Sequence, residues 1–405
     1  MARPTESEKA NLQTQVSQFL SRTKYACTEL TQLSGGTANF VYRGTLAEPL
    51  RLSDGSTTAT VVIKHSTDYV AINRDFPLDI TRCIYEETIL LALQKFTPPP
   101  TNVVKAPHLL HFDPAIHTSI MQDFFGAVDL KTAFVSSLHA VTPSVCESIG
   151  RHLGIWLRAF HEWASAPEQT RLRSTVINKP MRSLKRLITY DCFIEVLEQF
   201  PEVWSEEDGD DREMLEQVKQ MADKEFERQP DDCDETDTEQ RYHWGIIHGD
   251  LWSGNVLVPE SSSEGESQPQ IMIIDWELSQ FGHRAYDLGQ MIGDLYERKY
   301  FNGAAEGAQS AIRGFVEGFA EAGQLSDVFA FRVAIHAGVH LINWYRRRPK
   351  SAPILFSAEQ ITAALTMGKN FVRKGWERDR HWFEGTEIVG LFPNTRRFVG
   401  LNEHY

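Results

Sequence analysis

The sequence has no long hydrophobic run and only five cysteines. No stretch approaches the roughly eighteen consecutive apolar residues from which a membrane-spanning helix is predicted. The N-terminal residues are polar and charged and lack the apolar centre of a secretory signal. The cysteines are widely scattered, with no C-x-x-C pair for zinc binding or redox chemistry. We therefore expect a soluble, cytoplasmic protein with free thiols and no membrane partner.

Positive charge is also scarce. The 41 Lys and Arg residues are outnumbered by 55 Asp and Glu residues, so the formal net charge is −14. Nucleic acids and anionic membranes attract clustered Lys and Arg, so we expect neither as the main partner. A chain of 405 residues is long enough for two lobes, each with its own apolar core, and for a cleft between them. Neither length nor charge distinguishes a monomer from a homodimer.

One stretch carries most of the functional information: His248-Gly249-Asp250-Leu251-Trp252-Ser253-Gly254-Asn255. Asp250 and Asn255 are five positions apart, the same offset as the Asp and Asn of the kinase catalytic loop. Transfer of a γ-phosphoryl group from ATP to a hydroxyl needs a carboxylate that receives the hydroxyl proton and oxygen ligands that hold Mg²⁺ against the phosphates. We predict Asp250 as the base and Asn255 and Asp275 as the Mg²⁺ ligands. The alternative is an ordinary turn, because Gly-Asp and Gly-Asn pairs favour turns.

The segments beside this stretch favour the catalytic interpretation. Residues 244–247, 256–258 and 271–274 are short apolar segments typical of strands. The third ends directly before Asp275. Because a motif gains weight when its flanks have the expected form, we predict that strands carry the base and the metal ligands to one edge.

Near the N-terminus, residues 33–43 form a turn of small residues that runs into an alternating segment. Gly35 and Gly36 would let backbone N–H groups approach phosphate oxygens without an intervening side chain. The pattern therefore predicts two strands joined over a nucleotide phosphate. A plain hairpin has the same pattern and stays open as the alternative.

A lysine and a glutamate further along fit the same nucleotide site. Residues 60–65 alternate as a strand that carries Lys64 near its end, and residues 82–91 form a helix that contains Glu86. In kinases a strand lysine pairs with a helix glutamate and contacts the α- and β-phosphates. Two alternatives remain: Lys64 as a surface lysine, and Glu87 as its partner in place of Glu86.

Residues 118–124 are predicted to form a buried strand that runs out into a polar linker. At a hinge between lobes, this linker would expose the backbone near Gln122 and Phe124 to an adenine ring, and Met121 would line the back of the pocket. An ordinary core strand fits the same residues.

Most of the remaining sequence has helical periodicity. Helices are predicted at residues 9–21, 145–163, 212–227, 288–295, 312–319 and 333–345. His161, near the end of the second helix, is interpreted as a structural hydrogen-bonding residue. The acidic clusters between residues 205 and 239 lack the spacing of a calcium loop, so we interpret them as solvated loop ends. Whether this acidic segment has a further role stays open.

Several motifs together resemble the aminoglycoside phosphotransferase and choline kinase superfamily. They are Leu33-Ser34-Gly35-Gly36 with Asn39, Ile63-Lys64, Tyr85-Glu86, Ile120-Met121-Gln122-Asp123, His248 to Asn255, and Ile274-Asp275-Trp276-Glu277. Within the superfamily they are nearest to the methylthioribose kinases and to the fungal 4-hydroxytryptamine kinases of the psilocybin pathway, with Tyr286-Asp287-Leu288-Gly289 also in register. The Trp-Ser-Gly-Asn string is similar to fructosamine kinases too, so it does not identify a substrate.

The resemblance implies an α+β, bilobal, protein-kinase-like fold with ATP in the cleft. An N-lobe of residues 1–123 would contain an antiparallel sheet plus a helix and bind the nucleotide. A larger, mainly helical C-lobe of residues 124–405 would contain the catalytic loop, the metal site and the acceptor pocket. The implied cofactors are ATP and Mg²⁺, and the implied acceptor is a hydroxyl group of a small molecule.

The same resemblance implies roles for individual residues. Asn39 joins the nucleotide-binding group, Asp250 is the catalytic base, and Asp287 braces the catalytic loop. Glu277 is implied as a further metal ligand beside Asn255 and Asp275, although a contact with the acceptor stays open. A last group belongs to the acceptor pocket: Trp252, which could equally be a core residue, and His336, His340 and Trp344 on one helix.

Two other functions share parts of the pattern. A protein kinase would use the same chemistry, but only twelve residues separate Asp275 from Asp287, and no Ala-Pro-Glu follows a longer activation segment. A nucleotide-binding protein without catalysis would be expected to lack one of five polar groups, yet all are present: Lys64, Glu86, Asp250, Asn255 and Asp275. We therefore predict an ATP-dependent small-molecule kinase. Its acceptor is not identified, because periodicity does not define which helix side chains face a pocket.

Overall fold

The structure is a computed structural model that describes residues 3–52, 55–135, 142–204, 209–233, 237, 242–260, 270–301, 303, 305–323, 325–347 and 355–392. The chain divides into two units. The first consists of Met1–Lys95, Ala106–Ala127 and Ile274–Leu278, and the second of Phe96–Lys105, Val128–Ile273 and Ser279–Tyr405. Three short segments thus differ from the division expected at residue 123: residues 96–105 belong to the second unit, and residues 124–127 and 274–278 belong to the first.

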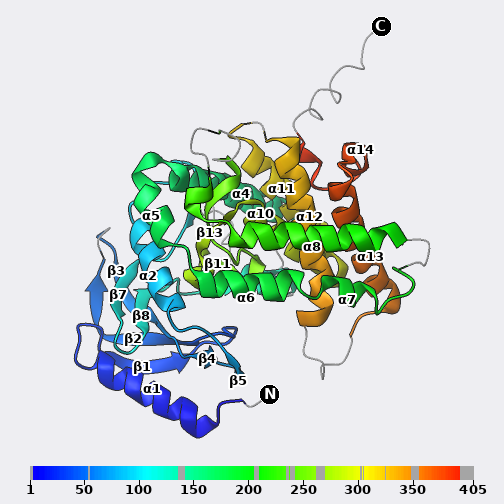
Figure 1. The fold of residues 1–405 in the computed structure, drawn as a ribbon. Helices are drawn as coiled ribbons and strands as arrows, with labels where there is room; N and C mark the ends of the chain where they lie inside the picture. Colours follow the sequence, from blue (N-terminus) through cyan, green and yellow to red (C-terminus); the bar gives the residue numbers. More distant parts are fainter. Residues whose placement is uncertain are drawn as a thin grey trace. The chain divides into compact units, whose positions relative to one another are not determined.

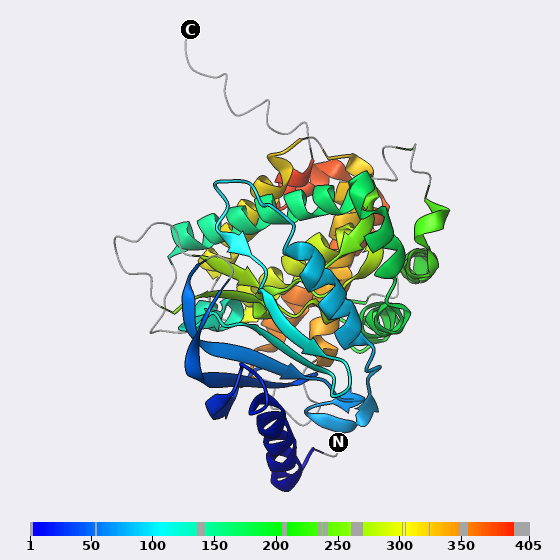
Figure 2. The same ribbon diagram turned by 90° about the vertical axis from the view of Figure 1, so that its left-hand side faces the viewer.

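The first unit is built on a five-stranded sheet in the order β1-β2-β3-β8-β7, in which all neighbours are antiparallel. Its strands are β1 Cys27–Gln32, β2 Phe40–Arg51, β3 Thr57–His65, β7 Leu109–Asp113 and β8 Thr118–Gln122. A small second sheet pairs β4 Tyr69–Val70 with β5 Asn73–Pro77. Helix α1 (Glu6–Leu20) lies beside β1, and α2 (Arg82–Leu93) lies beside β7 and β8 (Figures 1 and 2).

Side chains that alternate between the two faces of β2 and β3 explain how this sheet forms an apolar core. Tyr42 of β2 pairs with Ile63 of β3, and both are buried, together with Phe40 and Val61, in one apolar cluster. The cluster also contains Val16 and Leu20, which places α1 on this face of the sheet. Because successive side chains of a strand point to opposite faces, the next residue, Lys64, lies on the other face. The register of β3 therefore separates the apolar core from the polar site.

Helices make up most of the second unit. They are α3 Leu130–Val135, α4 Pro143–Ser165, α5 Thr170–Thr175, α6 Lys179–Tyr190, α7 Phe193–Leu197, α8 Gly209–Glu227, α10 Ala285–Phe301, α11 Ala305–Ala320, α12 Asp327–Arg347, α13 Ala358–Trp376 and α14 Arg380–Phe383. One-turn 3-10 helices accompany them: η1 Pro167–Gln169, η3 Pro230–Asp232, η4 Ser253–Asn255 and η6 Val389–Leu391. Helices α6 and α8 lie side by side, and α10 packs against both α11 and α12 (Figure 1).

The strands of the second unit form two small sheets. One has the order β6-β12-β11-β9, with β6 Val104–Lys105, β9 Ala127–Asp129, β11 Val256–Pro259 and β12 Ile271–Ile273. The other pairs β10 (Trp244–Ile247) with β13 (Gln280–His283). The stretch that contains Asp250 and Asn255 therefore connects strands of two different sheets. Strand β13 was not predicted, because its four residues carry little alternation.

Most of the predicted elements are confirmed. The structure has an antiparallel N-terminal sheet and a mainly helical remainder, which is the predicted α+β class, and the predicted helices correspond to α1, α4, α8, α10, α11 and α12. Helix α1 begins earlier than expected because Thr5 and Glu8 form a capping box at its start. Residues 205–208, 234–236 and 238–239 of the acidic segment lie outside the described residues. The five cysteines are free, as expected.

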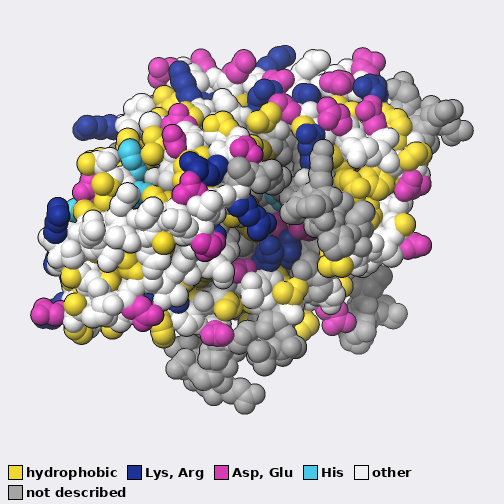
Figure 3. Space-filling model, turned by 90° about the horizontal axis from the view of Figure 1, so that it is seen from below, with side chains coloured by type: hydrophobic (Ala, Val, Ile, Leu, Met, Phe, Trp, Pro, Cys, Tyr) yellow, Lys and Arg dark blue, Asp and Glu magenta, His cyan; other side chains and the backbone are white. Residues whose placement is uncertain are grey.

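Two further features of the molecule are the distribution of charge on its surface and the apolar length of its helices. Acidic and basic side chains are interspersed over the face shown in Figure 3. In the part of the chain that the structure describes, no helix is both long and apolar enough to cross a bilayer.

Candidate active site

A buried lysine organises the polar site of the first unit. The Nζ atom of Lys64 lies 2.9 Å from Glu86 Oε1, 2.5 Å from Asp275 Oδ1 and 3.3 Å from Glu277 Oε2. Lys64 is only 5% exposed, so the alternative of a surface lysine is wrong. Burial favours the neutral amine, but the Asp275, Glu277 and Glu86 carboxylates outweigh it and raise the pKa of Lys64 well above its usual value.

Helix α2 supplies the glutamate of this site. Glu86 is 1% exposed and contacts Lys64, whereas the neighbouring Glu87 is half-buried, so the structure selects Glu86. The Trp276 backbone N–H also donates to Glu86 Oε1, at 3.1 Å. Glu86 therefore links the β3 lysine to the segment that carries Asp275.

Glu277 is held by a network that the sequence analysis did not anticipate. Its Oε2 atom accepts from Asn39 Nδ2 at 2.7 Å and from Arg82 Nε at 3.2 Å. Arg82 Nη2 donates in turn to Asn39 Oδ1 at 2.8 Å. Arg82 is completely buried, and its position at the start of an amphipathic helix gave no sign of this. These contacts favour a structural role for Glu277 and Asn39, while their predicted metal and nucleotide roles stay predictions.

Asp275 differs from Glu277 in both backbone and exposure. Its φ is +67°, in the left-handed region that Asp tolerates better than most residues. Its side chain is 34% exposed. Its Oδ2 atom receives no hydrogen bond from the described residues. Of the two acids, Asp275 therefore offers the more accessible oxygen for a metal ion.

The glycine turn connects β1 and β2, which pair as an antiparallel hairpin. Gly35 has φ +108°, a conformation that strains any L residue with a side chain. A Cβ at Gly36 would lie 3.4 Å from the nearest atom, which is ordinary contact. Of the two glycines, Gly35 thus requires glycine for the turn itself and Gly36 does not. The geometry is compatible both with two strands joined over a nucleotide phosphate and with a plain hairpin.

The predicted adenine-binding strand is β8. Met121 is buried and pairs with Val62 in the centre of the sheet, and the Gln122 backbone N–H donates to the His108 carbonyl oxygen at 2.9 Å. Phe124 follows the strand and is half-buried. The expected buried strand is confirmed, whereas contacts of these residues with a nucleotide stay a prediction.

In the second unit, three side chains contact Asp250: one at its carbonyl oxygen and Oδ2, and two at Oδ1. Asn255 Nδ2 donates to the Asp250 carbonyl oxygen at 2.9 Å and to its Oδ2 atom at 3.2 Å. Lys185 Nζ lies 3.3 Å from Oδ1, and Gln290 Nε2 lies 2.7 Å from the same atom. Burial favours the protonated carboxyl group, but the Lys185 ammonium and the Gln290 hydrogen bond outweigh it and lower the pKa of Asp250. The sequence analysis missed both Lys185 and Gln290.

Asp287 braces the backbone just before Asp250. Its two carboxylate oxygens accept from the backbone N–H groups of His248 and Gly249, each at 2.9 Å. His161 Nε2 lies 3.1 Å from Asp287 Oδ2. The interpretation of His161 as a structural hydrogen-bonding residue is therefore confirmed.

The burial of His161 predicts a pH dependence of stability. Burial lowers the pKa of His161 to about 4, and Arg284 and Arg158 add to the effect, although Asp287 opposes it. The unfolded chain takes up a proton below about pH 6.5, whereas folded His161 stays neutral until about pH 4. The unfolding free energy is therefore expected to fall with decreasing pH in this window, by at most about 1.4 kcal/mol per pH unit from this group.

Urea unfolding at several pH values would measure this effect. His161→Gln keeps an N–H donor for Asp287 but does not titrate, so the variant should lose less stability than the unsubstituted protein between pH 6.5 and pH 5. Equal losses in both proteins would show that His161 does not account for the acid sensitivity.

Along the chain, Trp252 lies between Asp250, the predicted base, and Asn255, a predicted metal ligand. Its indole ring is folded over Gly254, where an added Cβ would come within 2.3 Å of a ring carbon. Lys131 Nζ lies 5.5 Å from the centre of the ring, and the ring is half-buried. Glycine at position 254 is therefore required for this close approach of the Trp252 ring.

Comparison with known proteins identifies the family of this chain. Residues 86–322, more than half of the chain, match the APH phosphotransferase enzyme family. The chain belongs to this family.

Relatives of this phosphotransferase were found among both sequences and solved structures. Phosphotransferase FrzJ of Cladobotryum sp is 29% identical over 403 residues, which cover 96% of this chain and 98% of FrzJ. The 4-hydroxytryptamine kinase of Psilocybe cubensis is 22% identical over 320 residues, covering 77% of this chain and 79% of that kinase. The structure of a microcompartment-associated aminopropanol kinase aligns with a TM-score of 0.44 and 14% identity, covering 93% of this chain and 98% of that one.

Three of the four residues predicted for the acceptor pocket of this phosphotransferase lie buried along α12. His336 Nδ1 is 2.7 Å from the Tyr190 hydroxyl oxygen. Trp344 stacks on Phe301 with 3.7 Å between ring centres. His340 is 7% exposed. All three pack within the helical unit, and contact with an acceptor stays a prediction.

Among the described residues, one group of metal-ligating side chains lies elsewhere in the phosphotransferase. Asp294, Glu297 and His340 place one ligand atom each within 4.8 Å of the others. Arg298 forms ion pairs with both acids, at 3.3 Å to Asp294 and also with Glu297. The guanidinium thus already balances their charge, and the group gives no reason to invoke a metal ion.

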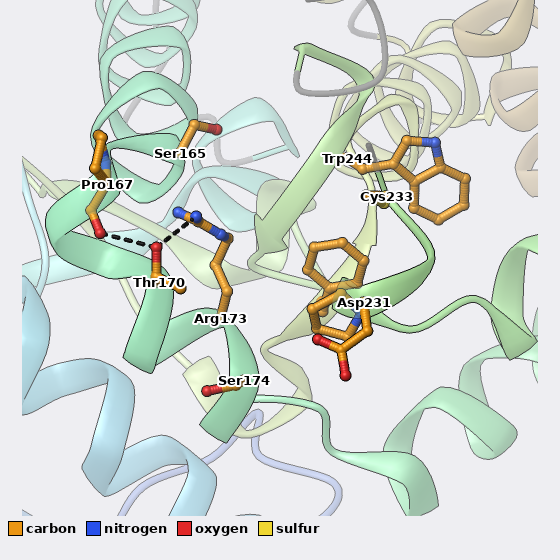
Figure 4. A pocket seen from close by; sticks show the side chains of 10 residues that line it. Ser165, Pro167, Thr170, Arg173, Ser174, Asp231, Cys233 and Trp244 are labelled. Atoms are coloured by element: carbon orange, nitrogen blue, oxygen red, sulfur yellow. Dashed lines mark hydrogen bonds between the residues drawn. The ribbon is translucent and has the colours of Figure 1, made fainter. Parts of the chain in front are cut away.

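A separate pocket of the phosphotransferase lies on the second unit, with a cavity volume of about 130 Å³ (Figure 4). Arg173 and Thr170 come from one helix, and Trp244, Asp231 and Cys233 lie across from them. Arg173 Nη2 donates to Thr170 Oγ1 at 2.9 Å. None of the predicted site residues lines this pocket, so we do not connect it with the chemistry of Asp250.

Proposed function

We propose that this phosphotransferase transfers the γ-phosphoryl group of ATP, with Mg²⁺, to a hydroxyl group of a small molecule, and that Asp250 accepts the hydroxyl proton. One observation carries the proposal: Asp250 is kept ionised by its neighbours, yet 26% of its side chain is exposed. A base must reach the proton that it accepts and must be unprotonated beforehand. The ionised state and the partial exposure of Asp250 therefore both support this role.

The first unit would bind the nucleotide. Lys64, held by Glu86, would contact the α- and β-phosphates. In the structure the lysine charge is balanced by three carboxylates, and the phosphates would take over part of that role. The backbone N–H groups of the Gly35 turn would bind phosphate oxygens in the same way as other glycine-rich turns do.

Asp275 and Asn255 are the proposed metal ligands. Asp275 Oδ2 and Asn255 Oδ1 receive no hydrogen bond from the described residues, and both are oxygen atoms, the ligand type that Mg²⁺ prefers. An Mg²⁺ ion held by these two residues would neutralise phosphate charge. Asn255 also donates to Asp250, so one side chain would link the base to the metal.

A small molecule is favoured over a peptide as the acceptor. Between Asp275 and Asp287 the chain forms η5 (Trp276–Leu278) and β13 and then enters α10 at Ala285, which leaves no room for a protein-kinase activation segment. The Psilocybe relative is named for a small hydroxylated amine, and this supports the same acceptor class here.

The test is direct. The protein is incubated with Mg²⁺, ATP and a panel of sugars, amino alcohols and hydroxyindoles, and products are analysed by mass spectrometry for the gain of one phosphoryl group. Phosphorylation of one class of alcohols is the expected result. Transfer to peptides, with none to any small alcohol, would contradict the proposal.

Replacement of Asp275 tests the metal assignment. Asp275→Asn removes the charged ligand, so the Mg²⁺ concentration for half-maximal rate is expected to rise at least tenfold, roughly the lower end of the loss in metal affinity seen when a contact at a metal site is removed. Calorimetric titration of nucleotide with and without Mg²⁺ gives a second readout that does not depend on turnover. Asp68→Asn, at an exposed position of the same unit, is the matched control. An unchanged Mg²⁺ dependence of nucleotide binding would remove Asp275 from the metal site.

A further inference from the structure

Helix α6 buries two basic side chains beside Met181 and Tyr190, and it exposes two apolar side chains. Lys185 is 2% exposed and Arg182 is 3% exposed, whereas Leu187 and Ile188 are 47% and 46% exposed. Removing an ammonium group from water costs several kcal/mol unless partners compensate for the loss. The observed orientation of α6 therefore depends on contacts that compensate for the burial of Lys185 and Arg182.

Lys185, Gln290 and Asp250 contact one another through their polar side chains. The Nζ atom of Lys185 lies 3.3 Å from Asp250 Oδ1 and donates to Gln290 Oε1. Gln290 Nε2 forms a 2.7 Å bond to the same Asp250 Oδ1. Because the amide oxygen of Gln290 accepts from Lys185, its nitrogen must face Asp250, so each residue orients the other two.

These contacts distinguish the two oxygens of the Asp250 carboxylate. Each carboxylate oxygen has two lone-pair positions. Oδ1 accepts from both Lys185 and Gln290, whereas Oδ2 accepts only from Asn255 among the described residues. One lone-pair position therefore remains on Oδ2 and none on Oδ1.

We propose that Lys185 and Gln290 form a clamp on Oδ1 of Asp250 and act as positioning residues that direct Oδ2 toward the acceptor hydroxyl. The inference rests on the proposed function. In the step that it describes, the acceptor oxygen bonds to the γ-phosphorus, the bond from that phosphorus to ADP breaks, and the hydroxyl proton moves to Oδ2. The clamp itself gains and loses no atoms.

Single substitutions test the clamp in the full-length protein with an acceptor found in the panel above. Lys185→Met is expected to lower kcat by about 100-fold, the cost of misplacing a reacting group by roughly 1 Å, with smaller changes in the KM values for ATP and acceptor. Lys185→Arg keeps the charge and N–H donors and should recover part of this loss. Lys179→Met, on the exposed first turn of α6, is the matched control and should leave kcat unchanged.

A double-mutant cycle separates positioning from a purely structural effect. If Lys185 acts through Asp250, then Lys185→Met should reduce the residual rate of Asp250→Asn by less than about threefold, because residues that act as one unit are not additive. Gln290→Met provides a second probe that leaves the Lys185–Asp250 charges balanced, and it should show the same non-additivity. Melting temperatures of all variants show whether each one is folded.

These outcomes distinguish a failure of the proposed clamp from a failure of the proposed function. If the unsubstituted protein phosphorylates an acceptor and the Lys185 and Gln290 variants match it, the clamp is wrong and the proposed function stands. Full additivity with Asp250→Asn likewise overturns the clamp, because the loss would then not pass through Asp250. If the unsubstituted protein phosphorylates nothing, the proposed function is wrong and the clamp loses its role with it.

Discussion

Asp250→Asn is expected to lower kcat by about 100-fold to 10,000-fold, the range contributed by a positioned proton acceptor. Asparagine keeps the shape of the side chain and can still accept from Lys185 and Gln290, which both contact Oδ1. It cannot accept the hydroxyl proton at neutral pH. The ATP affinity should change little, because Lys64 and the Gly35 turn belong to the other unit.

Two measurements separate loss of chemistry from loss of structure. Single-turnover formation of phosphorylated product reports the chemical step, and calorimetric titration reports ATP binding. Asp223→Asn, which removes a carboxylate from a surface ion pair with Arg186, serves as the control and should keep full activity, since exposed pairs contribute at most about 1 kcal/mol. Full activity of Asp250→Asn would show that another group accepts the proton.

The largest expected loss of stability follows from Lys64→Met. The ammonium group is buried among Glu86, Asp275 and Glu277. Methionine fills a similar volume but leaves these acids without that counter-charge. Removing one partner of a buried ion pair costs about 3 to 5 kcal/mol, and we expect the unfolding free energy of the first unit to fall by an amount of this order. Nucleotide binding should be lost as well, because the phosphates lose their cation.

Urea unfolding, followed by a probe within the first unit, measures this loss. Lys95→Met, an exposed lysine two residues beyond α2, should change the unfolding free energy by less than about 0.5 kcal/mol, as most surface substitutions do. Lys64→Arg is expected to be intermediate, since it restores the charge with a larger head group. If Lys64→Met were as stable as the control, the buried network would contribute nothing to this unit, and the carboxylates would have to be protonated.

The predictions made from sequence succeeded where the signal is local. The alternation of residues 60–65 predicted β3, and it follows that Lys64 and Ile63 lie on opposite faces. The apolar segments around Asp250 predicted β10, β11 and β12, because a short run of apolar residues bounded by turn residues needs no tertiary information to be recognised. The twelve-residue interval from Asp275 to Asp287 likewise excluded a long activation segment, because the length of an interval is a property of the covalent chain alone.

Helix α6 shows where local signals fail. Periodicity assumes that apolar residues face the core, so it would have turned Leu187 and Ile188 inward and Lys185 outward. The structure has the reverse orientation. Lys185 is also 65 positions from Asp250, and no spacing rule connects residues at such a distance. The same reason explains why Arg82, 195 positions from Glu277, was not recognised as its partner.

The sequence alone contained the pattern from which phosphoryl transfer is proposed for this protein. The identities and spacing of Asp250, Asn255 and Asp275 need only the covalent chain to be recognised. Tertiary structure decided which groups tune that chemistry: Glu86 over Glu87 beside Lys64, and Lys185 with Gln290 on one oxygen of Asp250. The physical reason is that spacing along the chain defines what a loop can present, whereas the energy of a buried charge depends on partners that packing brings from distant segments.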